Sequence, residues 1–211
     1  MGEERKIPKP TIKRLAVYYR CLSEMISEGK MYVSSKELAK KLKIKSSQVR
    51  KDLSYFGEFG KRGVGYNVRS LATELRKILG IDRRWRVVIV GAGNLGRAIA
   101  NYPGLYRNRF DVVAIFDKDP SKFGLVIGAA GPVRPMEELE SVVKSKKVEI
   151  GVIAVPAQAA QDVVEQLVKA GVKGIVNFAP VTLHVPGNVV VEDVDITVLF
   201  KAITFHLRKR P

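Results

Sequence analysis

Three glycines spaced as G-x-G-x-x-G stand between a run of β-branched residues and a stretch of helical character. The segment from Trp85 to Gly96 reads W-R-V-V-I-V-G-A-G-N-L-G, and its unbroken apolar run is typical of a strand buried on both faces of a parallel sheet. Gly91 allows a tight turn, Gly93 lets the backbone approach a pyrophosphate, and Gly96 lets the following helix lie close to the strand. The N–H groups at the start of that helix attract an anion. The predicted cofactor contacts in this loop are Gly91, Ala92, Gly93, Asn94, Leu95 and Gly96.

An acidic residue follows the next predicted strand. The strand Val112 to Phe116 ends in Asp117, which lies 26 residues after Gly91. A carboxylate there can accept hydrogen bonds from the adenosine ribose hydroxyls and repel a 2′-phosphate, so Asp117 favours NAD(H) over NADP(H). Lys118 is the neighbouring residue, also expected at the site, and it leaves NADP(H) open. The alternative is a capping or loop aspartate that touches no ligand.

Strands and helices alternate beyond this motif. We expect a strand over residues 148–155, a helix over 157–170, a strand over 174–177 and a last strand over 189–191. This order predicts a doubly wound α/β domain, whose ligands bind at the carboxyl ends of the strands. Asn177 could orient a nicotinamide through its amide, or form a turn. The cofactor contacts predicted at these strand ends are Pro156, Asn177, Phe178, Ala179 and Pro180.

Charge is concentrated in the first part of the chain. Of 37 Lys and Arg and 21 Asp and Glu, residues 1–86 hold 22 and 9, whereas residues 87–211 hold 15 and 12. The net charge of +16 is therefore divided as +13 and +3. This asymmetry indicates a polyanion partner for the first domain, nucleic acid before membrane, because no basic amphipathic helix with an aromatic face is present. The alternative is general solubilising charge.

The basic part has the pattern of a helix-turn-helix. A helix is expected from Thr11 to Gly29, and Ser34 with Glu37 offers a capping box for a short second helix. After the turn 43–45, Ser46 or Ser47 is expected to cap a third helix that runs to about residue 56. The apolar face predicted for the first helix consists of Ile12, Leu15, Ala16, Tyr19, Leu22 and Ile26.

The third helix and the segment after it carry the predicted DNA contacts. Val49, Leu53 and Phe56 form an apolar stripe, which leaves polar and basic side chains outward for a major groove. Residues 57–68 read as a β-hairpin wing with Lys61 and Arg62 at its tip, although a solvated turn is the alternative. The predicted contacts are Ser46, Ser47, Gln48, Arg50, Lys51, Ser54, Tyr55, Phe59, Lys61, Arg62 and Gly63.

These observations divide the chain. A helix from about Ser70 to Gly80 precedes the motif strand, so we expect a DNA-binding domain over 1–80, a nucleotide-binding domain over 81–194 and a terminal helix over 195–211. The terminal helix has an apolar face that needs a partner surface. The single cysteine, Cys21, excludes an intramolecular disulfide and is expected to be buried. Without a membrane-length apolar run or a signal-peptide pattern, a cytoplasmic protein is the default, and no metal site is expected.

Five blocks of sequence resemble the family of redox-sensing transcriptional repressors named Rex. The resemblance covers nearly the whole chain in the family's order, and its most specific part is Q-V-R-K-D-L-S-Y-F-G followed by R-G-V-G-Y. The blocks are Gln48 to Gly57, Lys61 to Tyr66, Gly91 to Gly96, Asn101 to Gly104 and Asn177 to Pro180.

The resemblance implies a homodimer of winged-helix domains joined to Rossmann-like NAD(H)-binding domains. The terminal helix would be exchanged between subunits, near the partner's nicotinamide, and the protein would bind palindromic operators until NADH binds. Arg20, Tyr102 and Asp195 match family residues of a switching polar network. Alternatively they are a helix-surface arginine, a helix-end aromatic and a helix N-cap. Some relatives carry arginine where this chain has Asn94.

Two other function classes are open. An NAD-dependent dehydrogenase with a basic appendage would need a positioned acid or base, yet the only histidines, His184 and His206, do not follow a sheet strand in an obvious cleft. No catalytic residue is therefore predicted. A nucleotide-binding or CoA-binding interaction module would share the glycine motif but would leave residues 48–66 unexplained.

Overall fold

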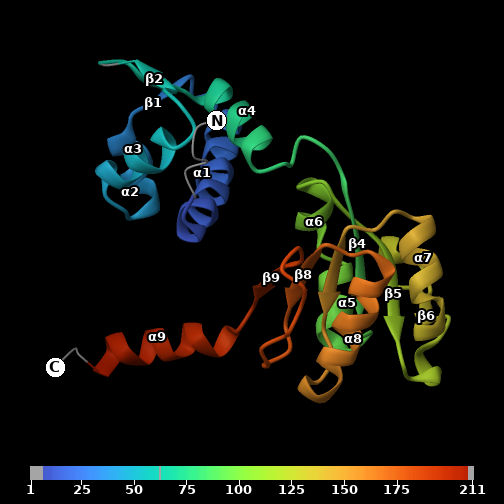
Figure 1. The fold of residues 1–211 in the computed structure, drawn as a ribbon. Helices are drawn as coiled ribbons and strands as arrows, with labels where there is room; N and C mark the ends of the chain where they lie inside the picture. Colours follow the sequence, from blue (N-terminus) through green and yellow to red (C-terminus); the bar gives the residue numbers. More distant parts are fainter. Residues whose placement is uncertain (1–6, 62, 209–211) are drawn as a thin grey trace. The chain divides into compact units, whose positions relative to one another are not determined.

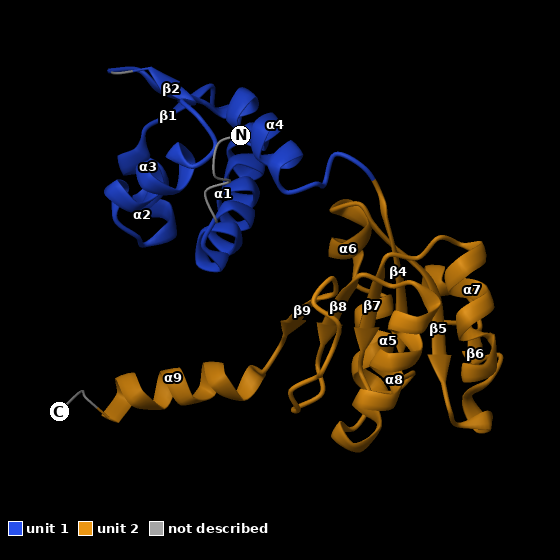
Figure 2. Cartoon of the chain, viewed as in Figure 1, with its two compact units in different colours: residues 1–83 blue, residues 84–211 orange. Residues whose placement is uncertain are grey.

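The computed structural model describes residues 7–61 and 63–208, and the chain divides into two compact units, residues 1–83 and 84–211 (Figure 2). The predicted boundary near residue 80 lies within the last few residues of the first unit. The elements of unit 1 are α1 Lys9–Ser27, β1 Tyr32–Val33, α2 Ser35–Leu42, α3 Ser46–Ser54, β2 Gly60–Lys61, β3 Gly65–Asn67 and α4 Val68–Ile78 (Figure 1).

Helix α1 starts earlier and buries a different face than the sequence predicted. It begins at Lys9 rather than at Thr11, because Pro10 fits the first turn of a helix, where no backbone donor is needed. Ile12 and Ala16, predicted for the core, are exposed, whereas Tyr18 is buried. The buried residues of α1 are Thr11, Leu15, Tyr18, Cys21, Leu22 and Met25.

The helix-turn-helix forms as expected except at one cap. Ser34 accepts a hydrogen bond from the Glu37 N–H and the Glu37 carboxylate accepts one from the Ser34 N–H, which completes the capping box. The predicted serine cap of α3 is wrong. Lys45, with an extended backbone, is the N-cap residue, because the chain is already helical at Ser46, and its ammonium offers no acceptor for a side-chain cap.

The wing is a small antiparallel sheet with the strand order β1-β3-β2. The sequence predicted the β2–β3 hairpin but not β1, whose two residues are too few for a periodic pattern. Helix α4 follows β3 directly, with Asn67 as its cap, so it begins two residues before the predicted Ser70.

Unit 2 contains a six-stranded parallel sheet with the order β6-β5-β4-β7-β8-β9. The order reverses direction between β4 and β7, which is the topology of a dinucleotide-binding sheet. The elements are β4 Trp85–Val90, α5 Asn94–Ala100, α6 Pro103–Arg107, β5 Phe110–Asp117, the 3-10 turn η1 Pro120–Lys122, β6 Val133–Pro135, α7 Leu139–Ser145, β7 Ile150–Ile153, α8 Ala157–Ala170, β8 Gly174–Asn177, β9 Val190–Asp193 and α9 Ile196–Arg208.

Apolar side chains alternate between the two faces of this sheet. Val88 and Val90 of β4 belong to a core with α7 and α8, whereas Val87 and Ile89 belong to a second core with the end of α5. Burial on both faces explains why the strand reads as an uninterrupted apolar run. Strand β6 and helices α6 and α7 carried no sequence pattern strong enough to be predicted.

Helix α9 exposes its apolar residues in the single chain. Every described residue of α9 is exposed, including Leu199 at 65% and Phe200 at 67%. Figure 1 shows the helix continuing beyond β9, away from the sheet of its own unit. No helix in residues 7–61 and 63–208 is both long and apolar enough to cross a membrane, and no group of three or more metal-ligating side chains occurs there.

Candidate dinucleotide pocket and nucleic-acid interface

A pocket of about 880 Å³ lies where the strand order of the unit 2 sheet reverses. Its walls come from the carboxyl ends of β4, β5 and β7, from the first turn of α5 and from one side of α8 between Ala159 and Gln166. Ligands of doubly wound sheets bind at this position. The lining residues are Val90, Gly91, Gly93, Asn94, Leu95, Asp117, Lys118, Asp119, Lys122, Met136, Ala154, Val155, Pro156, Ala159, Asp162, Val163 and Gln166.

The glycines of the loop after β4 have distinct geometric roles. Gly91 has φ +105°, and a Cβ there would overlap the carbonyl oxygen of Ala154. A Cβ at Gly96 would overlap the carbonyl oxygen of Gly91, so α5 lies against the loop as predicted. At Gly93 a Cβ would meet no atom within 4 Å, and this residue lines the pocket. The missing side chain of Gly93 therefore leaves space in the pocket, whereas those of Gly91 and Gly96 leave space for neighbouring backbone atoms.

Asp117 closes one end of this pocket and already has three hydrogen-bond donors. Its Oδ2 accepts from the Ala92 N–H at 2.7 Å and from Lys122 Nζ at 3.0 Å, while Oδ1 accepts from the Asp119 N–H at 2.9 Å. An ionised carboxylate has about four acceptor positions, so one remains for a ligand. Burial alone would raise the pKa of Asp117, but these hydrogen bonds outweigh it and lower the pKa.

Ten lining residues were not predicted: Val90, Asp119, Lys122, Met136, Ala154, Val155, Ala159, Asp162, Val163 and Gln166. Lys122 stands at the end of the 3-10 turn η1, and no motif marks a lysine five residues after the acidic residue. Asp162 and Gln166 are four residues apart on α8, together with Ala159, so they share one helix face. The sequence shows that these residues share a helix face. Only the pairing of β7 with β4 shows that this face lies beside the glycine loop.

Not all the predicted cofactor residues lie in this pocket. Asn177 is buried, and its amide donates to the Val181 carbonyl and to Asp193 and accepts from the Ala179 N–H. Both protons of the amide nitrogen are thus engaged within the fold, which fits the turn-forming alternative, and the contact with a nicotinamide stays a prediction. Phe178 is half-buried, while Ala179 and Pro180 line a separate hollow together with Val194 and Asp195.

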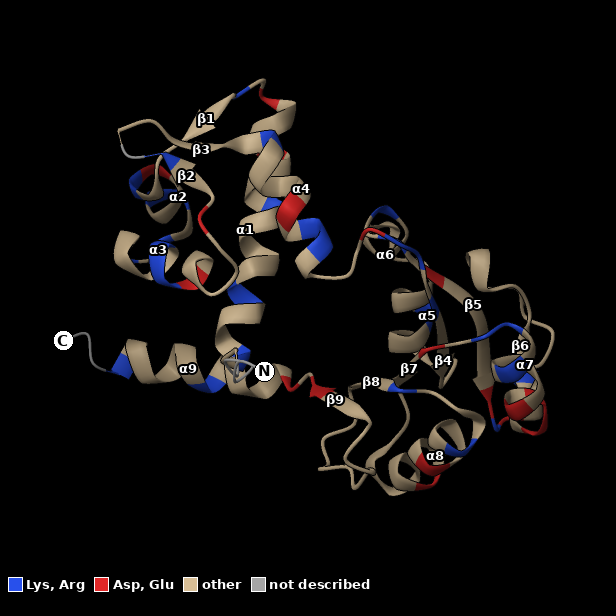
Figure 3. Ribbon diagram, turned by 45° about the horizontal axis from the view of Figure 1, so that its top comes forward, with Lys and Arg blue, Asp and Glu red and all other residues tan. Residues whose placement is uncertain are grey.

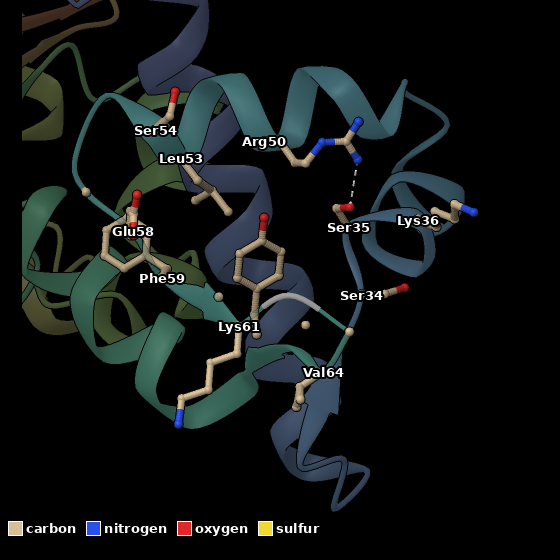
Figure 4. Close-up of a pocket in the computed structure, with 15 residues that line it drawn as sticks. Ser34, Ser35, Lys36, Arg50, Leu53, Ser54, Glu58, Phe59, Lys61 and Val64 are labelled. Carbon is tan, nitrogen blue, oxygen red and sulfur yellow. Dashed lines mark hydrogen bonds between the residues drawn. The ribbon is translucent and has the colours of Figure 1, made fainter.

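Unit 1 has an open groove of about 1080 Å³ between α3, the start of α2 and the wing (Figure 4). Arg50 crosses it and donates to the Ser35 hydroxyl at 3.1 Å. Among the predicted DNA contacts, Arg50, Ser54, Phe59, Lys61 and Gly63 line the groove. The residues that were not predicted are Ser34, Ser35, Lys36, Leu53, Gly57, Glu58, Gly60, Val64, Gly65 and Tyr66.

The predicted DNA contacts of α3 that do not line the groove differ in exposure. Ser47 and Lys51 are exposed, and Ser46 and Tyr55 are partly buried. Arg62 lies outside the described residues. In Figure 3 the ribbon is blue at the Lys and Arg positions of α2 and α3, and these helices carry Lys36, Lys40, Lys41, Arg50 and Lys51. An exposed basic face of this kind suits a polyanion.

A buried aspartate holds α3 to α1. Asp52 has no exposed surface, and its carboxylate accepts hydrogen bonds from Thr11, Arg14, Tyr18 and Gln48. Arg14 is bidentate, with distances of 2.6 and 2.7 Å. Burial would raise the pKa of Asp52, but the hydrogen bonds from Arg14, Tyr18 and Gln48 lower it to about 2. Gln48, predicted to face DNA, is thus held by the core through its Nε2.

The three predicted switch residues occupy separate elements. Arg20 is exposed on α1, and Tyr102 is 62% exposed before α6. Asp195 precedes α9 and accepts hydrogen bonds from the Thr197 N–H and hydroxyl at 2.8 and 2.7 Å, which lower the pKa of its carboxyl. This geometry is that of a helix cap, and the polar network implied by the resemblance stays a prediction.

Comparisons with known proteins cover both units. Residues 6–54 match the family "Putative DNA-binding protein N-terminus", and residues 82–181 match the family "CoA binding domain". The "Redox-sensing transcriptional repressor Rex" of Thermosipho africanus (strain TCF52B) is 55% identical over 206 residues, which are 98% of each chain.

Two solved structures are similar over nearly the full length. One, "RSP in complex with beta-NAD+ and operator DNA", has a TM-score of 0.90 and 39% identity, and the match covers 96% of this chain and 93% of that chain. The other, "RSP in complex with beta-NADH", has a TM-score of 0.88 and 37% identity, with 97% and 95% covered. Similarity at this level covers both the groove and the pocket.

Proposed function

Because the chain belongs to the Rex family of redox-sensing transcriptional repressors, we propose that it binds palindromic operator DNA as a homodimer and leaves that DNA when NADH binds. The observation that carries the proposal is the presence, in one chain, of a basic helix-turn-helix groove and a pocket at the reversal point of a dinucleotide-binding sheet. The relatives with these two parts include a repressor solved with operator DNA and with NADH.

The DNA-binding part of the proposal rests on α3 and the wing. The exposed residues Ser47, Arg50 and Lys51 on the first turns of α3 would reach base edges and phosphates in a major groove. Lys61 and Arg62 of the wing would reach phosphates or the adjacent minor groove. Ser35 and Lys36 at the start of α2 would add phosphate contacts on the other side of the groove.

The cofactor part rests on the loop after β4. The pyrophosphate of NADH would lie against the backbone of residues 91–95, where Gly93 leaves the pocket open, and the adenosine ribose would lie near Asp117. We propose that Phe178, Ala179 and α9 of a second copy provide apolar surroundings for the nicotinamide. Such surroundings disfavour the positive charge of the oxidised ring and so favour NADH over NAD+.

The exposed face of α9 supports the dimer. Leu199, Phe200 and Ile203 are more than half exposed in the single chain, which is costly for a helix of this apolar character unless another surface covers it. We propose that residues 195–211 pack on the second subunit. NADH would then favour a dimer arrangement whose two α3 helices no longer match half-sites one helical turn apart, ~34 Å.

Three sets of measurements test this function. A gel-shift titration on a palindromic probe should show retention that weakens with salt and release by NADH at lower concentration than by NAD+. Retention that is the same with and without saturating NADH would refute the switch. Sedimentation should give a dimer, and Leu199→Asp with Ile203→Asp should give a monomer. No NADH oxidation is expected with carbonyl substrates, and turnover would favour the dehydrogenase alternative.

A further inference from the structure

The adenosine end of the pocket has balanced charge, because the structure adds a second acid and a second lysine to the two charged residues that the sequence predicts there. Four charged residues line it: Asp117, Lys118, Asp119 and Lys122. The Asp119 carboxylate is engaged by the N–H and hydroxyl of Ser121. Simple repulsion by Asp117 is therefore an incomplete account of how this end would treat a 2′-phosphate.

Lys122 is held against Asp117 by the local backbone. The turn η1 brings its Nζ to 3.0 Å from Asp117 Oδ2, and 3.7 Å from Asp119 Oδ2. The Lys122 side chain is one-third exposed and the Asp117 side chain is 8% exposed, so the ion pair is only partly screened by solvent. The ammonium is thus fixed at the pocket wall, and its charge is neutralised by the adjacent carboxylate.

We propose that Lys122 is a specificity-determining residue, a latent ligand for a 2′-phosphate that Asp117 keeps paired, so that the Asp117–Lys122 ion pair sets the preference for NADH over NADPH. This inference rests on the proposed function, because it assumes that the pocket binds a dinucleotide. The pair would act in two ways. Asp117 repels the phosphate dianion, and it also occupies the cation that would otherwise bind that anion.

This proposal and a simple loss of repulsion predict different NADPH affinities for variants of Asp117 and Lys122. When Asp117 is replaced by a neutral residue, Lys122 loses its closer ionic partner and keeps only the longer approach to Asp119, 3.7 Å from its Oδ2. The ammonium stays at the pocket wall and can then bind the 2′-phosphate. If the gain in NADPH affinity came only from the loss of repulsion by Asp117, it would not depend on a lysine at position 122. The double variant therefore separates the two explanations.

The experiment measures equilibrium affinities for NADH and NADPH by ligand fluorescence with the full-length protein. Asp117→Asn should raise the affinity for NADPH relative to that for NADH at least tenfold. Adding Lys122→Gln should remove most of that gain, whereas adding Lys118→Gln should leave most of it. Lys122→Arg in the Asp117→Asn background keeps the cation and should keep the gain.

Several outcomes would overturn the inference. A gain that survives in the Asp117→Asn, Lys122→Gln double variant would mean that loss of repulsion is the whole effect. An equal fall of both affinities on Lys122→Gln alone, with no change in their ratio, would mean that Lys122 only supports the loop. Lys144→Gln is the matched control, because Lys144 also pairs with an acid, Glu140, but lies on α7 away from the pocket lining.

The outcomes for the proposed function are distinct. Wild-type protein that binds neither dinucleotide would refute the proposed function and this inference with it. If the wild-type protein binds NADH, but Lys122→Gln leaves the ratio of NADH to NADPH affinity unchanged both alone and combined with Asp117→Asn, only this inference is refuted.

Discussion

Each unit contains an aspartate that is at least nine-tenths buried, and the two differ in what surrounds their carboxylates. Asp52 in unit 1 is fully buried, and its donors among residues 7–61 and 63–208 are side chains on α1 and on its own helix α3. Asp117 in unit 2 is 7% exposed at a pocket wall and receives two backbone N–H groups and one lysine. Both have a lowered pKa, so the pKa direction alone does not separate a structural carboxylate from a ligand-facing one.

The difference reflects how each unit builds its site. The groove of unit 1 is lined by residues of α3, the start of α2 and the wing, and a buried polar cluster holds α3 to α1. The pocket of unit 2 consists largely of backbone at strand ends, and glycines fix its shape. Substitutions should therefore damage unit 1 by removing buried hydrogen bonds and unit 2 by steric overlap with its backbone. For each variant, the binding activity of the unit that is not changed serves as an internal control.

The largest effect is expected from Asp52→Asn. The change replaces an acceptor of five hydrogen bonds with a group that also donates, and leaves Arg14 without its ionic partner. Removing one partner of a buried ion pair costs about 3–5 kcal/mol. Denaturant unfolding of the full chain should show this loss for unit 1, together with a loss of DNA retention of more than tenfold. NADH affinity should not change.

The pH dependence supplies a second readout of the same residue. The pKa of Asp52 in the folded state, about 2, lies below the ordinary value of an aspartate, so its contribution to stability is fully present above about pH 4. That contribution is lost as the pH falls from about 4 toward 2. Asp52→Asn should reduce this acid sensitivity of unit 1, and Glu74→Gln, at an exposed acid on α4, should not. An unfolding free energy that is unchanged at neutral pH would contradict the structural role.

Gly96→Ala should have the next largest effect, and it should fall on unit 2. The added methyl group overlaps the Gly91 carbonyl oxygen, so α5 must shift away from the loop, at a cost of about 1–3 kcal/mol. Gly93→Ala is the matched control, since its methyl group meets no protein atom. It should leave the unfolding free energy nearly unchanged and lower NADH affinity by crowding the pocket. Equal destabilisation by both changes would contradict the distinction.

Asp117→Asn should have a smaller effect on stability and a clear one on the cofactor. The amide keeps an acceptor for one backbone N–H but loses the charge that pairs with Lys122, so NADH affinity should fall about tenfold, or ~1.4 kcal/mol. The variant should stay on operator DNA at NADH concentrations that release the wild type. Normal release would remove Asp117 from the cofactor site.

The sequence predicted those parts of the molecule in which local pattern and fold agree. The strand before Gly91 and the helix α8 were predicted because burial on both faces and helical periodicity leave strong signals. The capping box of α2 was predicted because its two hydrogen bonds depend on residues only three apart. The family resemblance added the prediction that unit 1 binds operator DNA and that unit 2 binds NAD(H).

Other features could not be predicted because they depend on contacts between distant residues. Asp52 joins side chains up to 41 positions away, so its neighbours on α3 gave no sign that it was buried. The amide of Asn177 is used by Asp193, which becomes its neighbour only through the pairing of β8 with β9. Ile12 fitted the periodicity of α1 but is exposed, since a helix stripe predicts more apolar residues than one domain core can cover.

The smallest effect is expected from Lys61→Ala, on the outer surface of unit 1. Lys61 is exposed in the wing and lines the groove with Phe59 and Gly63, so its loss should not change the fold. If it neutralises one phosphate, operator affinity should fall about threefold for all sequences, and the slope of log affinity against log salt should decrease by about one. Lys77→Ala is the control, because Lys77 is exposed on α4 beside Glu74 and outside the groove. An unchanged salt slope for Lys61→Ala would place the wing away from the phosphates and would restrict the DNA-binding surface of unit 1 to α3 and the start of α2.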